Sequence, residues 1–379
     1  MAGIYIHVPF CKTRCIYCDF YSSTHEERKQ EYVWALSDEL TTRSGYLPDK
    51  EIGTIYLGGG TPSQLSPREL ERLFDVIYRN YQVSSEAEIT LEANPDDLSP
   101  SYLQTLNYLP VNRLSIGIQT FDDTLLRKLR RRHSAAQAIE ALHRCREYGF
   151  GNISIDLMYG LPGQDLTTWQ QDMRQALLLR PEHLSAYHLT YEEGTPLHRM
   201  LEEGTVREEQ EEISLQYFSR LMEQTEAAGY EHYEISNFAL PGYHSRHNSS
   251  YWEEVPYLGC GPSAHSFNGE SREWNVSSLT EYIQGWKTGR RLFETEPRSL
   301  ATSYNEYILT RLRTRKGIPT DAIGQRYGKE YDRYFRDQIQ PYLQKECVEL
   351  AQDHIRLTRR GMFISDAIMR DLLYIEEEE

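Results

Sequence analysis

The sequence predicts an α/β protein: a partial barrel of six βα units, followed by a small, mainly helical C-terminal domain. Short runs of β-branched and aromatic residues alternate with longer amphipathic stretches, and this alternation stops near residue 290 of the 379. Such alternation indicates a parallel sheet with helical crossovers. Six βα units fit a partial or complete barrel better than a sheet with helices on both faces, although spacing alone does not decide between these folds.

Six runs are expected to form the strands of the barrel. They cover residues 4–8, 54–57, 89–92, 113–118, 153–158 and 184–189. The helices around them are expected at residues 26–44, 67–80, 122–148 (with a break near His133), 166–179 and 215–228. We assign residues 1–290 to this domain, and within it residues 229–267 form a segment rich in glycine, histidine and aromatic side chains.

Residues 291–379 are assigned to the C-terminal domain. Helices are expected at residues 304–313, 321–327 and 331–343, followed by a hairpin at 348–357 and a last helix from Ser365. This order is similar to a winged helix. A DNA-binding domain needs a basic face, whereas acidic and basic side chains nearly balance here. We therefore interpret this part as a packing or lid domain.

Charge and hydropathy exclude several classes of protein. The chain has 41 Lys and Arg against 57 Asp and Glu, a net charge of −16, which argues against nucleic acid as a partner. The N-terminus lacks a basic region followed by an apolar run, and no stretch approaches the length of a membrane span. We expect a cytoplasmic protein with no transmembrane segment, whose thiols stay reduced.

Three of the six cysteines lie within eight residues, directly after the first predicted strand, as Cys11-x3-Cys15-x2-Cys18. A zinc site needs four ligands, so His7 or His25 would have to join them. A redox pair needs only two cysteines, and buried structural cysteines need no such spacing. A [4Fe–4S] cluster takes four thiolates, so three leave one iron open to a small molecule. We favour the cluster.

The triplet resembles the hallmark of the radical S-adenosylmethionine superfamily. Further motifs follow in the order found in its oxygen-independent coproporphyrinogen III oxidase group: YIHVPFC at residues 5–11, GGGTP at 58–62, LEANP at 91–95, GIQTF at 117–121 and IDLMYGLP at 155–162. The resemblance implies that the open iron binds S-adenosylmethionine, which an electron from the cluster cleaves to a 5′-deoxyadenosyl radical. It also implies a reductant such as flavodoxin or ferredoxin.

Polar residues follow several predicted strands at their carboxyl ends, where parallel βα barrels form their active sites. By resemblance, these positions and two tyrosines near the cysteines bind S-adenosylmethionine. The expected residues are Tyr5, Tyr17, Gly59, Gly60, Thr61, Glu92, Gln119, Arg131 and Asp156. Taken singly, a Glu or Gln at a strand end is more often a loop cap, and an Arg in a basic run is more often solvated; their shared order favours the site.

Two departures set this chain apart from the oxidase itself. The oxidase has a further cysteine two residues after the third one, whereas Asp19 and Phe20 follow Cys18 here. It also has an extension ahead of its cysteines that contributes to the substrate site, and only ten residues precede Cys11 here. We therefore expect that this chain does not carry out the oxidative decarboxylation.

A second motif indicates another activity. His247, Asn248, Tyr251 and Trp252 form an HNxxYW sequence that resembles the signature of the HemW-type haem chaperones. A neutral histidine is a good axial ligand of haem iron, and the two aromatic rings suit a flat macrocycle. Histidines beside aromatic residues are more often simply packed, and Cys260 is a weaker alternative ligand.

These observations leave three hypotheses. The first is a haem chaperone that holds a [4Fe–4S] cluster and S-adenosylmethionine, binds haem and transfers it to acceptor haem proteins. The second is a radical oxidase or decarboxylase that acts on coproporphyrinogen III or a related substrate. The third is a zinc-stabilised barrel without redox chemistry. We favour a haem carrier over an oxidase.

Overall fold

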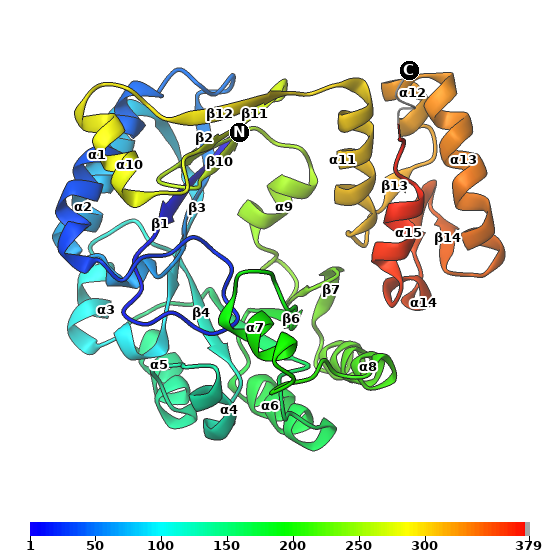
Figure 1. The fold of residues 1–379 in the computed structure, drawn as a ribbon, viewed down its shortest axis with the longest axis horizontal. Helices are drawn as coiled ribbons and strands as arrows, with labels where there is room; N and C mark the ends of the chain where they lie inside the picture. The colour runs from blue at the N-terminus through cyan, green and yellow to red at the C-terminus, as the bar shows by residue number, and fades with distance from the viewer. Residues whose placement is uncertain (376–379) are drawn as a thin grey trace.

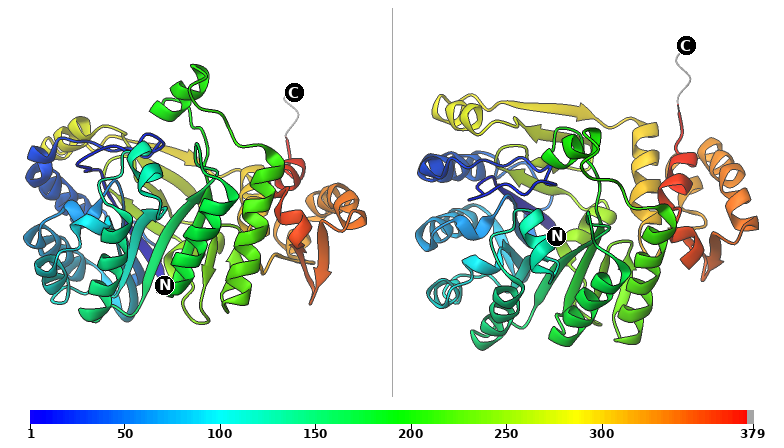
Figure 2. Two further views of the ribbon diagram at one scale, coloured as in Figure 1. Left: turned by 90° about the horizontal axis from the view of Figure 1, so that it is seen from below. Right: turned by 60° about the horizontal axis from the view of Figure 1, so that its bottom comes forward.

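The computed structural model describes residues 1–375 and shows a curved twelve-stranded sheet with helices along its outer face, beside a smaller, mostly helical part (Figures 1 and 2). Six neighbouring parallel strands form the centre of the sheet: β1 (Ala2–Val8), β2 (Glu51–Gly59), β3 (Gln82–Ala93), β4 (Arg113–Gln119), β5 (Ile153–Tyr159) and β6 (His183–His188). The predicted fold class, a partial βα barrel with a helical C-terminal region, is confirmed.

Helices that follow these strands cover the outer face: α1 (Lys29–Thr42), α2 (Pro67–Asn80), α3 (Pro100–Leu106), α4 (Asp123–Lys128), α5 (Ala135–Glu147), α6 (Leu166–Leu179) and α8 (Glu211–Ala227). Local sequence explains their ends. Helix α2 begins with a capping box between Ser66 and Glu69 and has Pro67 in its first turn. The expected break near His133 is present, because Arg130 adopts a positive φ and Ser134 caps a new helix.

The strands alternate between two environments. Ile4 and Ile6 belong to the hydrophobic core together with Leu36 of α1. The residues between them face the inside of the barrel and are polar or aromatic, as period-two alternation requires. Across this inner face Tyr5 pairs with Tyr56 in register. Polar and aromatic side chains therefore line the concave face of the sheet, whereas side chains on the convex face pack with the helices to form the core.

Both edges of the central sheet carry short strands that the sequence did not predict. They are β7 (Glu231–Glu234), β8 (Asn237–Ala239), β9 (Tyr257–Cys260), β10 (His265–Phe267), β11 (Ser271–Asn275) and β12 (Phe293–Pro297). Strand β9 pairs in parallel with β1, and β8 pairs antiparallel to β6. Two helices lie in the same stretch, α9 (Arg246–Trp252) and α10 (Leu279–Lys287), and a further short one, α7 (Pro196–Glu202), follows β6.

The C-terminal part has its own hydrophobic core. It contains α11 (Leu300–Leu312), β13 (Ile318–Pro319), α12 (Ala322–Tyr327), α13 (Lys329–Gln344), β14 (Val348–Ala351), β15 (His354–Leu357), α14 (Arg359–Met362) and α15 (Ser365–Asp371). Because β12 still pairs with the large sheet, the division at residues 290 and 291 stays a prediction. Among residues 1–375, no helix is long and apolar enough to cross a membrane.

Candidate functional site

The three clustered cysteines lie on the loop that follows β1, at the carboxyl ends of the parallel strands. All three are partly exposed free thiols. Cys11 Sγ lies 3.4 Å from Thr61 Oγ1, and an Arg131 guanidinium nitrogen donates to Cys15 Sγ at 3.5 Å. Burial raises the pKa of the Cys18 thiol to about 11. The Cys18 thiol is thus protonated at neutral pH, and binding a metal centre would release its proton.

The geometry around the loop bears on the kind of metal centre. Within the described residues, no group of three or more Cys, His, Asp or Glu side chains could hold a single metal ion. The ring nitrogens of His7 contact the Tyr5 hydroxyl and the Tyr21 carbonyl, at 3.1 and 2.8 Å, and His25 pairs with Glu27. Neither histidine joins the cysteines. A cubane cluster binds each thiolate at a different iron, so its thiolates need not meet at one point.

The glycine motif holds the end of β2 against the cysteine loop. Gly59 has a φ of 102°, and a Cβ there would lie 2.5 Å from His7 Nδ1. A Cβ on Gly60 would lie 2.8 Å from the Val8 carbonyl oxygen. The Gly60 N–H donates to that same oxygen at 2.8 Å. Both positions therefore require glycine, because a Cβ at either one would collide with residues at the end of β1.

Two half-buried carboxyl groups face the inside of the barrel. Glu92 accepts from the Tyr56 hydroxyl at 2.7 Å and from the Gly59 N–H at 3.2 Å. Burial raises its pKa to about 7. Asp156 accepts from the Ser115 hydroxyl at 3.4 Å, and burial raises its pKa to about 6. Both groups can be neutral or charged near neutral pH, so a bound cation would favour their ionised forms.

Arg131 joins the cysteine loop to two strand ends. One guanidinium nitrogen donates to Asn94 Oδ1 at 2.6 Å and also to the Gly117 carbonyl, while another donates to Cys15. Its Nε is buried and has no partner among the described residues. Asn94 was not predicted as a site residue, although it lies within the LEANP motif.

The remaining expected residues are placed less closely together. Tyr17 lies between Cys15 and Cys18, and burial raises the pKa of its hydroxyl. Gln119 ends β4 with a φ of 73°, a left-handed conformation that is uncommon for a non-glycine residue. Tyr5 lies deeper in the barrel, where its ring stacks on Tyr56 at 6.3 Å between centroids.

The HNxxYW motif forms helix α9, which packs against the inner face of β2. His247 is only 1% exposed. Its Nδ1 lies 2.8 Å from Thr54 Oγ1 and its Nε2 lies 2.9 Å from the Tyr251 hydroxyl. Burial lowers the pKa of His247 to about 3, so the ring is neutral. Thr54 lies in the first half of β2, and His247 is therefore nearer the amino ends of the strands than the cysteine loop is.

The other motif residues serve several contacts. Ser245 caps helix α9, and its hydroxyl accepts from the backbone N–H of Asn248 at 3.3 Å. The Trp252 ring lies 4.8 Å from the Arg313 guanidinium, and its Nε1 has no partner among the described residues. Glu88, which sequence reasoning missed, accepts from the backbone N–H of His247 at 3.0 Å. Haem ligation by His247 stays a prediction, and it would require the ring to give up a hydrogen bond.

Comparison with known proteins decides the family. Residues 5–176 match the radical SAM superfamily, and residues 299–364 match the HemN C-terminal domain. The haem chaperone HemW of Bacillus subtilis is 35% identical over 371 residues, which cover 97% of this chain and 98% of that protein. The chain belongs to the HemW branch of the radical SAM superfamily. Membership in this superfamily implies a [4Fe–4S] cluster and S-adenosylmethionine.

Two further relatives place this branch. The mitochondrial radical S-adenosyl methionine domain-containing protein 1 of Bos taurus is 31% identical, and the alignment covers 98% of this chain and 87% of that protein. Among solved structures, coproporphyrinogen III oxidase (HemN) from Escherichia coli superposes with a TM-score of 0.85 at 22% identity, covering 98% of this chain and 90% of that one. This second likeness shows the shared fold.

The residues present fit the implied cofactors. Three thiols on one loop supply three of the four thiolates that a cubane cluster takes. On the inner side of the same loop, the Nε of Arg131 has no partner among the described residues and can donate a hydrogen bond, and the carboxyl groups of Glu92 and Asp156 can accept hydrogen bonds. A ligand with an ammonium group and hydroxyls would satisfy these groups.

Proposed function

We propose that this protein is a haem chaperone that holds a [4Fe–4S] cluster and S-adenosylmethionine, binds haem, and transfers it to acceptor haem proteins. The observation that carries the proposal is the similarity to a haem chaperone, 35% identity over 97% of this chain. The chain also carries the HNxxYW motif, at residues 247–252 on one short helix.

The cysteine loop has a defined role in this proposal. Cys11, Cys15 and Cys18 hold the cluster, while Thr61 and Arg131 orient two of the sulfurs through the contacts described above. When bound, the cluster supplies electrons to S-adenosylmethionine. A reductant of the flavodoxin or ferredoxin type would then reduce the cluster again.

The barrel side chains are proposed to bind S-adenosylmethionine. Gly59 at the end of β2, and Gly60 and Thr61 directly after it, lie beside the loop and are assigned to its methionine part. Glu92 is assigned to hydrogen bonds with ribose hydroxyls or the ammonium group. Because its pKa is raised to about 7, its capacity to accept these bonds depends on pH near neutrality. The nucleoside side is assigned to the remaining predicted residues, which are Tyr5, Tyr17, Gln119, Arg131 and Asp156.

Haem titration tests the proposal. The purified full chain, reconstituted anaerobically with iron and sulfide, should give a saturable Soret change near one equivalent of haem. A chain that shows no saturable change would reject the chaperone function. His247→Ala tests the predicted ligand separately, because loss of an axial ligand changes the Soret position of bound haem.

Iron and sulfide analysis tests the cofactor. We expect both elements in the anaerobically reconstituted wild type and strongly reduced amounts in Cys15→Ala, with Cys347→Ala as a control from the C-terminal core. Zinc without labile sulfide would contradict the cluster. Anaerobic incubation with coproporphyrinogen III and a reductant should give no protoporphyrinogen IX, and turnover would favour the oxidase instead.

A further inference from the structure

A cavity of about 580 Å³ lies beside the cysteine loop, beyond the carboxyl end of β5. Its apolar lining comes from four segments of the chain and comprises Ile16, Leu125, Leu129, Leu161, Met200 and Val206. These side chains belong to a hydrophobic cluster that is separate from the barrel core. A volume of this size lies within the range of small-molecule sites, about 300–1,000 Å³. The cavity is thus large enough for a ligand and is not part of the S-adenosylmethionine site described above.

The cavity shares a wall with the cysteine loop. Ile16, between Cys15 and Tyr17, donates its N–H to the Leu129 carbonyl at 3.4 Å, and its own carbonyl accepts from the Leu197 N–H at 2.9 Å. The loop is thereby fixed to the end of α4 on one side and to α7 on the other (Figure 1). A molecule in the cavity would contact the segment that carries the proposed cluster ligands.

Two cations complete the lining. Lys128 and Arg207 both line the cavity and are exposed. Within residues 1–375 neither side chain makes an ion pair, although the chain has 57 acidic against 41 basic residues. An apolar cavity bordered by two unpaired cations suits a flat apolar molecule that carries two carboxylates. Haem has this chemistry.

We propose that haem binds in this cavity, with its macrocycle among the six apolar side chains and its two propionates at Lys128 and Arg207. The proposal rests on the haem-chaperone function, and it places haem in this cavity instead of at His247, the ligand predicted from the sequence. It requires no buried hydrogen bond to break, whereas binding at His247 would displace Thr54 or Tyr251. It also puts haem next to the cysteine loop, against Ile16.

Charge reversal at the two cations tests the proposal. In the full-length, cluster-reconstituted protein, the double variant Lys128→Glu/Arg207→Glu should bind haem and protoporphyrin IX about tenfold more weakly, since two solvent-exposed ion pairs are replaced by repulsion. Binding of haem dimethyl ester, which lacks both carboxylates, should change little. Both substituted residues are on the surface, so the fold should be retained, as the thermal unfolding midpoint would show.

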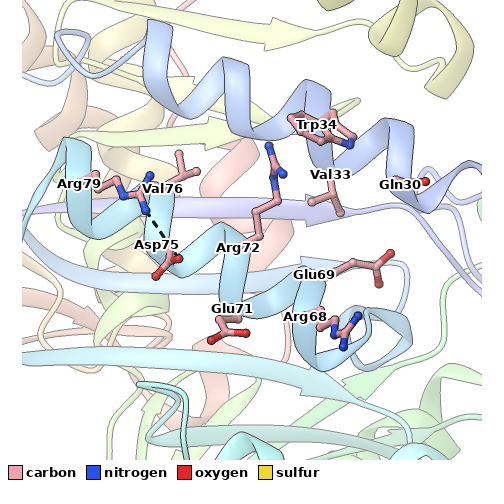
Figure 3. Close-up of a pocket in the computed structure, with 10 residues that line it drawn as sticks. All are labelled: Gln30, Val33, Trp34, Arg68, Glu69, Glu71, Arg72, Asp75, Val76 and Arg79. Carbon is pink, nitrogen blue, oxygen red and sulfur yellow. Dashed lines mark ion pairs between the residues drawn. The ribbon is translucent and has the colours of Figure 1, made fainter.

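A second cavity provides the matched control. A pocket of about 490 Å³ lies between α1 and α2. Figure 3 shows Arg68 and Arg79 there beside acidic side chains, and Arg79 pairs with Asp75. The double variant Arg68→Glu/Arg79→Glu makes the same change of charge there and should leave haem affinity unchanged. If it weakens haem binding as much as the first variant does, the effect is one of net charge and the proposed site is wrong.

Filling the cavity tests its apolar part. Val206→Trp should weaken binding of haem and of its dimethyl ester alike, because the larger ring occupies the space of the macrocycle. If the wild type binds haem while this variant and the charge variant bind it equally well, the proposed site is wrong and the chaperone function stands. If the wild type binds no haem, the function itself fails. If oleate displaces bound protoporphyrin at a lower concentration than haem does, the cavity is a fatty-acid site and the proposal is overturned.

Discussion

Replacing Thr54 by valine should destabilise the protein without changing the volume of the barrel interior. The Thr54 hydroxyl is the partner of His247 Nδ1 at 2.8 Å, and both side chains are buried. Valine keeps the shape and removes the hydroxyl, which leaves a buried ring nitrogen without a partner. An unsatisfied buried polar group costs about 1–3 kcal/mol. We therefore expect the free energy of unfolding to fall by about that amount.

Thr90 provides the matched control for this prediction. It is also fully buried on the inner face, but its hydroxyl has no hydrogen-bond partner among the described residues. Thr90→Val should be neutral or stabilising, because it removes a buried polar group that is already unsatisfied. Urea denaturation of the two variants, followed by tryptophan fluorescence, measures the difference. Equal changes in both variants would refute the reasoning that His247 is held by a hydrogen bond worth keeping.

Three further predictions concern the cysteine loop and the barrel interior. Gly60→Ala should lower the iron and sulfide bound per chain, because its Cβ would meet backbone atoms at 2.8 Å, whereas Gly151→Ala, with nothing within 4 Å, should not. Burial raises the pKa of Glu92 from 4.5 to about 7, so the folded state binds the extra proton and stability falls as pH rises between these values. Unfolding midpoints at pH 5 and 8 should differ more in the wild type than in Glu92→Gln; equal differences would contradict this assignment. Arg131→Met should weaken S-adenosylmethionine binding about tenfold by calorimetry, since hydrogen bonds from a charged group are lost; Arg130→Met, an exposed neighbour, should bind normally, and a shared loss would point to general charge.

The sequence predicted the centre of the fold because its strands and helices carry strong local signals. The helices at residues 67–80 and 166–179 begin and end where expected, since Ser66 and Asp165 cap them and an apolar face follows. The edge strands were missed because each has five residues or fewer, and because β9 and β8 join the sheet through partners distant in the sequence, β1 and β6. Pairing of this kind depends on tertiary structure and leaves no periodic pattern.

The candidate site shows the same division. The cysteine spacing and the glycines were visible in the sequence because they act locally. Glu88, Thr54 and Asn94 were missed, since their contacts with His247 and Arg131 join segments far apart in the chain. The sequence also could not show that His247 is buried with both ring nitrogens engaged, which only the packing of α9 against β2 determines.

Haem transfer tests the central claim most directly. The cluster-reconstituted chain is loaded with one equivalent of haem, freed of excess haem, mixed anaerobically with the apo form of a b-type haem protein, and separated by size. A chaperone should pass its haem to the acceptor, so that the Soret absorbance moves to the acceptor fraction and this chain returns haem-free. Haem that stays on this chain at equilibrium, with an acceptor known to bind it more tightly, would contradict the proposed function.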